Sequence, residues 1–119
     1  MGRRSRRRAR GDEGEPPAST SDYTDAGGNV LTLRDELSAG TIRRIQTEGS
    51  KPAASAEDLA QRRTELLFER LAVRWVISDL PLEGQRELLG RFRMASADER
   101  RWVRETLDEH LGTHLPELR

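Results

Sequence analysis

The densest run of apolar residues in the chain covers residues 66–77, where three charged side chains interrupt it. On a helical wheel its apolar side chains point in nearly all directions, and a helix of this kind is enclosed on most sides. Ser55 has the character of a helix N-cap and is followed by acidic residues, and Pro81 cannot continue a helix. The pattern predicts a central helix over residues 56–78.

Two amphipathic segments follow and predict two further helices, over residues 82–93 and 97–111. The second begins with a capping box, in which Ser96 is the N-cap and Glu99 lies three residues later. Together with the central helix, these segments predict a mainly α, three-helix bundle-like domain over residues 56–119.

Patterning typical of β-structure is confined to a short passage near the N-terminus. There, β-branched and aromatic residues flank Gly27-Gly28-Asn29, which supplies the positive φ angles that a tight turn needs. The accessory segment formed by residues 22–47 is expected to pack on the helical domain. Its predicted elements are a hairpin (22–25 and 30–33) and a short helix (38–46), with a linker (48–55) behind them.

A basic block followed by an acidic block opens the chain. Residues 1–10 contain six arginines and no acid, whereas residues 11–33 contain five acids and no base. After Met1, the first 21 residues hold no sizeable hydrophobic side chain, so they cannot bury enough apolar surface to offset the entropy lost on ordering. We predict that residues 1–21 form a disordered basic-then-acidic tail.

Composition adds a question about how the central helix is covered. Apolar residues make up 34% of the chain and charged residues 35%, so only part of the chain is expected to pack. A domain limited to residues 56–119 would bury only ~60% of its unfolded surface and would be marginally stable. The helix therefore needs cover from residues 22–47, from a second copy or from a partner. Its edge formed by Phe68, Leu71 and Trp75 is the predicted partner-binding surface.

Two histidines raise the question of a metal site. His110 and His114 are spaced i, i+4, which places both on one face of an unbroken helix. Gly112 lies between them, the sequence specifies no third ligand, and histidines near a helix C-terminus are favoured by the helix dipole without any metal. We therefore expect no metal and no cofactor.

Catalytic motifs are missing from the sequence. The chain has no cysteine, no glycine-rich phosphate loop and no nucleophile elbow, so we expect a protein that is not an enzyme. Residues 82–111 invite comparison with a helix-turn-helix, whose second helix meets DNA with its N-terminal part. Asp98 and Glu99 occupy that part and would be repelled by phosphates, which favours a purely structural helical pair.

The cellular location is predicted from the lack of a membrane-spanning segment and of a signal peptide in the sequence. Charged residues break the longest apolar run, so it is too polar to span a bilayer, and no apolar region follows the N-terminal arginines as a signal peptide would require. We expect a cytoplasmic protein with no membrane partner. Arginine outnumbers lysine 20 to 1, which we attribute to GC-rich coding, in line with a bacterial source.

The pattern as a whole predicts a small non-catalytic protein, an interaction or regulatory module that acts through a helical surface on a protein partner or on a second copy. The alternative is a nucleic-acid-associated protein, whose flexible arm makes phosphate contacts without reading sequence. A third interpretation of the arm is that it only keeps the chain soluble. The arm's arginines are Arg3, Arg4, Arg6, Arg7, Arg8 and Arg10.

Overall fold

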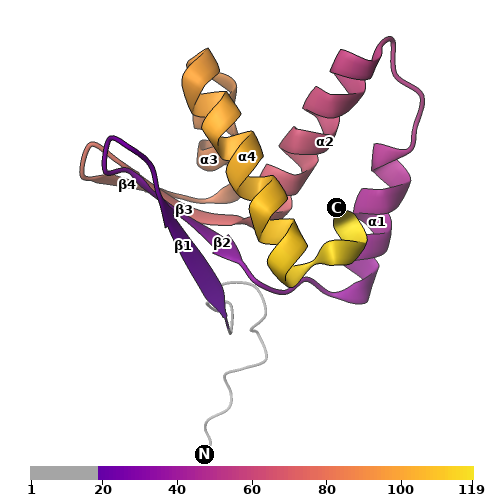
Figure 1. Ribbon diagram of the computed structural model, residues 1–119, viewed down its shortest axis with the longest axis horizontal. Helices are drawn as coiled ribbons and strands as arrows, with labels where there is room; N and C mark the ends of the chain where they lie inside the picture. Colours follow the sequence, from indigo (N-terminus) through magenta and orange to yellow (C-terminus); the bar gives the residue numbers. More distant parts are fainter. Residues whose placement is uncertain (1–18) are drawn as a thin grey trace, which may run out of the picture.

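A four-stranded antiparallel sheet and four helices make up the fold of the computed structural model, which describes residues 19–119 (Figure 1). The predicted mainly α, three-helix bundle is therefore wrong, and the fold class is α+β. The elements in chain order are β1 (Thr20–Thr24), β2 (Val30–Arg34), α1 (Ala39–Gly49), α2 (Ala56–Leu71), β3 (Ala72–Ile77), β4 (Leu80–Glu83), α3 (Gln85–Arg93), α4 (Ala97–His114) and the 3-10 helix η3 (Pro116–Leu118).

The error lies in the second half of the predicted central helix. Helix α2 ends at Leu71, and the six residues of β3 continue directly from it as a strand. β3 is rich in β-branched and aromatic residues, which pack well on a pleated surface. Periodicity alone does not distinguish a helix from a strand in a short apolar run of this kind. Here, pairing with β2 selects the strand.

A two-residue turn joins β3 to β4. Its residues, Ser78 and Asp79, both have positive φ angles, 53° and 67°, as in the type I′ turn that suits the twist of a hairpin. The side-chain oxygen of Asn29 accepts a hydrogen bond from the Ser78 amide at 3.0 Å, which ties the two hairpin turns together. Pro81 lies in β4, an edge strand of the sheet, where a missing N–H is tolerated.

The predicted N-terminal hairpin is present, with strands at Thr20–Thr24 and Val30–Arg34, but its first strand begins inside the segment 1–21 that was predicted to be disordered. In its turn, the Asp25 carboxylate accepts hydrogen bonds from the amides of Gly27 and Asn29, and Gly28 takes a φ of 87°. The hairpin is integral to the sheet, because β2 is a central strand that pairs with β1 on one side and with β3 on the other. Leu31 of β2 lies opposite Trp75 of β3.

The core lies between one face of the sheet and the helices. Leu31, Leu33 and Trp75 are buried on that face, while their neighbours along the strands are partly or fully exposed. The Phe68 ring of α2 stacks on Phe92 of α3 at a centroid distance of 4.9 Å and meets Trp75 edge-on at 5.6 Å. These rings join α2, α3 and the sheet in one hydrophobic cluster.

The last helix is predicted best, because local signals define its start. Ser96 and Glu99 form both hydrogen bonds of the expected capping box. Its C-terminal end differs from the prediction, since α4 continues through Gly112 to His114. A Cβ at Gly112 would clash with the Arg119 guanidinium, which lies across the helix there and pairs with Asp108 at 3.0 Å. Gly112 therefore lies within the helix, beneath the Arg119 side chain, and does not end it.

The turn between β3 and β4 gives a direct test of the corrected fold. Replacing Ser78 and Asp79 by Asn-Gly supplies the residues that a type I′ turn prefers, and we expect the free energy of unfolding to rise by about 0.5–1 kcal/mol. If the chain were helical here, the same change would lower stability by about 1 kcal/mol, because glycine disfavours helix. Urea denaturation of both proteins measures the sign. The Gly28→Ala variant is the matched control. It should lose stability, because the backbone at position 28 has a positive φ that alanine disfavours.

Candidate functional site

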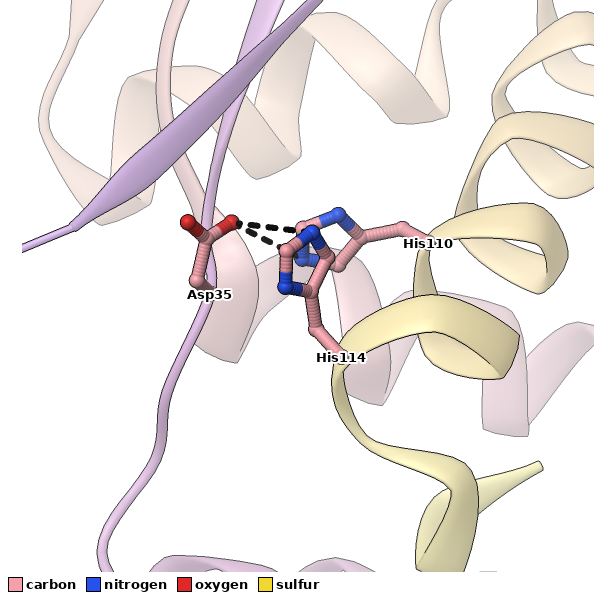
Figure 2. A group of neighbouring side chains, drawn as sticks. All are labelled: Asp35, His110 and His114. Atoms are coloured by element: carbon pink, nitrogen blue, oxygen red, sulfur yellow. Dashed lines mark ion pairs between the residues drawn. The ribbon is translucent and has the colours of Figure 1, made fainter.

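Three side chains that can bind a metal or move a proton converge where β2 leaves the sheet (Figure 2). Asp35 follows the last residue of β2 directly, and His110 and His114 project toward it from the last turns of α4. The His114 Nε2 atom lies 3.5 Å from Asp35 Oδ1, and the His110 Nε2 atom lies 3.9 Å from the same oxygen. The two imidazole rings are neighbours, with their centroids 4.7 Å apart.

His110 is fully buried, and both of its ring nitrogens have hydrogen-bond partners. Its Nε2 lies 2.7 Å from the carbonyl oxygen of Arg34, and its Nδ1 lies 2.7 Å from the Tyr23 hydroxyl. A carbonyl can only accept, so Nε2 carries the proton and Nδ1 accepts from Tyr23. Burial lowers the pKa of His110, an effect that the hydrogen bond to the Arg34 carbonyl partly opposes. The ring is therefore neutral in this arrangement.

Two serine hydroxyl groups hold Asp35, one from β1 and one from the residue before that strand. Ser19 Oγ donates to Oδ2 at 2.5 Å, and Ser21 Oγ donates to Oδ1 at 2.6 Å. Partial burial raises the pKa of this carboxyl, but the two hydrogen bonds and the nearby histidines outweigh it, so the pKa is lowered. Asp35 is thus a fixed, ionised carboxylate. Burial also raises the pKa of the Tyr23 hydroxyl, with a further contribution from Glu109 and Asp35, so it stays a hydrogen-bond donor.

The same group of side chains does not form a catalytic triad. Ser21 Oγ lies 3.4 Å from His114 Nε2, and Asp35 Oδ1 approaches that same nitrogen. In a triad the nucleophile and the carboxylate contact different nitrogens, so that the histidine can take a proton from one while the other orients it. The geometry here instead directs the Ser21 hydroxyl proton to Asp35 at 2.6 Å.

The sequence identified part of this cluster. The i, i+4 spacing placed His110 and His114 on one helical face, and the continuous α4 confirms that placement. Sequence reasoning missed Asp35, because its approach to α4 depends on pairing between segments far apart in the chain. The only signal in the sequence was that Asp35 directly follows an apolar strand. Acidic residues are common at such positions, so the signal does not indicate a site.

The structure places the predicted partner-binding residues in the core. Phe68 and Leu71 are 0% exposed and Trp75 is 1% exposed. The strand that carries Trp75 pairs with β2, so residues 22–47 supply the cover that this edge was expected to need. A partner would have to open the core to reach the three side chains. The predicted nucleic-acid-binding residues, Arg3, Arg4, Arg6, Arg7, Arg8 and Arg10, lie outside the described residues.

A second feature is a cleft between α2 and α4, which diverge toward their N-terminal ends (Figure 1). The cleft has a volume of about 600 Å³. A smaller hollow of about 180 Å³ continues it toward the core and shares Ala60, Thr64 and Arg104 with it. The residues that line the larger hollow are Glu57, Ala60, Gln61, Thr64, Glu65, Phe92, Arg93, Arg100 and Arg104.

Comparisons with known proteins add no assignment to either feature: the chain matches no protein-family model, no curated protein and no solved structure. Within residues 19–119, no helix is long and apolar enough to cross a membrane.

The Tyr23–His110 pair gives a test of how the cluster is held together. Removing the hydroxyl in Tyr23→Phe leaves the buried Nδ1 of His110 without a donor, and we expect a loss of about 1–3 kcal/mol in the free energy of unfolding. A double-mutant cycle with His110→Leu separates this bond from the loss of the hydroxyl itself. A coupling energy near zero, measured by urea denaturation, would contradict the bond.

Proposed function

We propose that the protein is a small non-catalytic interaction module, which binds an acidic segment of another protein in the cleft between α2 and α4. The observation that carries the proposal is this cleft of about 600 Å³, which lies between α2 and α4 and is also lined by the end of α3. Seven of its nine lining residues are polar or charged, whereas small-molecule sites are mostly apolar. A lining of this kind suits the side chains of a peptide segment better than a compact ligand.

Exposure of α2 supports the same proposal. Residues 56–61 of this helix are all exposed, although Ser55 caps its first turn. Helices in proteins gain most of their stability from tertiary packing, and no other described segment covers these turns. A partner segment lying between α2 and α4 would supply that packing. The small side chains of Ala60 and Thr64 on the α2 wall permit a close approach.

Charge indicates the chemistry of the partner. Arg93 is paired with Glu65 at 3.0 Å. Arg100 reaches only the carbonyl oxygen of Ala95, and neither it nor Arg104 has an ion pair among the described residues. Two arginines and one acid, Glu57, thus line the cleft without an ion pair among the described residues, which leaves an excess of positive charge. We infer that the bound segment carries acidic residues for these arginines, together with an apolar side chain that contacts Phe92.

The chemistry of the cleft supports a non-catalytic role. Its lining holds neither histidine nor cysteine, and the Thr64 hydroxyl donates to the Ala60 carbonyl within its own helix. No side chain there is placed to act as an activated nucleophile. Cytoplasmic location is part of the same proposal, on the sequence grounds given above.

Photo-crosslinking in the source organism tests the proposed cleft. A photoreactive amino acid at Gln61, an exposed position in the cleft wall, should trap one discrete partner. The double variant Arg100→Glu/Arg104→Glu should reduce trapping at least about tenfold, because like charges across an interface are repelled. The matched control is Arg43→Glu/Arg44→Glu, which reverses two exposed charges on α1, outside the cleft, and should trap as efficiently as the unaltered protein.

Three results would contradict the proposal. These are the absence of a crosslinked product, a product that survives reversal of the cleft charges, and a product with twice the mass of the chain. The last of these would assign the cleft to a second copy of the protein instead of a different partner.

A second candidate function is sequence-independent nucleic-acid binding by the arm, favoured by six arginines without an acid in residues 1–10. Deletion of residues 2–10 should abolish binding to generic DNA and RNA. In the full chain, the logarithm of the affinity should fall with the logarithm of salt concentration, with a slope of up to about −5 for six phosphate contacts on duplex DNA. Fluorescence anisotropy at several salt concentrations measures both effects. Binding that survives the deletion, or that is absent from the full chain, would exclude the arm as a nucleic-acid-binding segment.

A further inference from the structure

We propose that Asp35, His110 and His114 form a binding site for a divalent transition-metal ion of the zinc class. One carboxylate oxygen and two imidazole nitrogens supply the donor atoms, all within 4.8 Å of one another. The proposal is independent of the cleft between α2 and α4, which shares no residue with this cluster.

The spacing of the donor atoms supports a shared ion. The distances from Asp35 Oδ1 to the histidine nitrogens, 3.5 and 3.9 Å, exceed the 2.7–3.2 Å usual for a hydrogen bond to nitrogen. Ligands at about 2.0–2.1 Å from a tetrahedral ion lie roughly 3.3–3.4 Å apart. The two histidine nitrogens therefore lie near the separation of metal ligands from Asp35 Oδ1, and all three donor atoms lie within 4.8 Å of one another.

The donor set selects the class of ion. Two imidazoles and one carboxylate suit Zn²⁺, Ni²⁺, Cu²⁺ or Fe²⁺, whereas Mg²⁺ and Ca²⁺ prefer sites built from oxygen alone. The i, i+4 spacing of His110 and His114 fixes two of the ligands on one rigid helix. The third ligand, Asp35, follows the last residue of β2 directly and is held in place by Ser19 and Ser21.

An outer layer of hydrogen bonds already orients each buried ligand. Ser19 and Ser21 hold the Asp35 carboxylate, and Tyr23 contacts His110 at the ring nitrogen that faces away from Asp35. Metal-binding histidines usually make such a contact through the second nitrogen. Binding through His110 Nε2 places the ring proton on Nδ1, where the Tyr23 oxygen can accept it. The Arg34 carbonyl, which accepts from Nε2 at 2.7 Å without the ion, then loses its donor.

The site is closed on one side and open on the other. His110 is fully buried, while 30% of the His114 side chain is exposed and provides the path of entry. Three protein ligands leave a fourth position for water or for a group from another molecule.

Titration of the tag-free full chain with ZnCl₂ at neutral pH tests the site. Isothermal calorimetry should show one ion per chain, and Co²⁺ in its place should show the visible absorption of a tetrahedral N/O complex. At about 100 times the dissociation constant, the melting temperature should rise by roughly 10 °C or more. His114→Ala and Asp35→Asn should each weaken zinc binding at least about tenfold. Loss of a hydrogen-bond partner of a ligand already costs about that much, and loss of a ligand should cost more.

Glu109→Gln is the matched control, because it removes a carboxylate from the same part of α4 without removing a proposed ligand, and it should bind as the unaltered protein does. His114→Ala is the decisive variant, since its partly exposed position allows the metal-free fold to persist, as circular dichroism will show. Failure of the unaltered chain to bind zinc would overturn the proposal. Equal zinc affinity in the folded His114→Ala variant would overturn it as well.

Discussion

The pairing of β2 with β3 is the constraint on which the rest of the structure depends. It places Leu31 opposite Trp75 and gives Phe68, Leu71 and the other core side chains of α2 a sheet to pack against. The same pairing makes β2 a central strand, and Asp35 follows its end directly. The buried side chains of this sheet face and of the helices form one hydrophobic cluster, which depends on that pairing.

Two different regions follow from this arrangement, at opposite ends of α4. Near its C-terminal end, hydrogen bonds join side chains of β1 to Asp35 and to the two histidines of the helix. Near its N-terminal end, α4 and α2 separate, and exposed charged side chains border an open cleft. Hydrogen bonds hold the first region, where we propose a small ion, and the second is an open cleft, where we propose a chain segment. One helix thus positions both candidate sites without a shared residue.

Local signals made the sequence informative wherever short-range interactions decide the structure. The capping box at Ser96 and Glu99 and the turn at Gly27–Asn29 identified elements correctly, because each depends on atoms a few residues apart. The interpretation was wrong where partners far along the chain decide. Residues 72–77 are apolar enough for either a helix or a strand, and only pairing with β2 selects the strand. Asp35 was missed as a neighbour of His110 and His114 for the same reason.

The contact between Tyr23 and His110 spans 87 positions of sequence and has a consequence for how the chain acquires its structure during synthesis. The N-terminal hairpin is synthesised first, whereas β3, which pairs with it, and α4, which contacts it through His110, are synthesised later. An isolated hairpin is marginally stable in water, so β1 and β2 must wait for most of the remaining chain. Formation of the native sheet is therefore expected to follow synthesis of α4 and to be governed by closure of long loops.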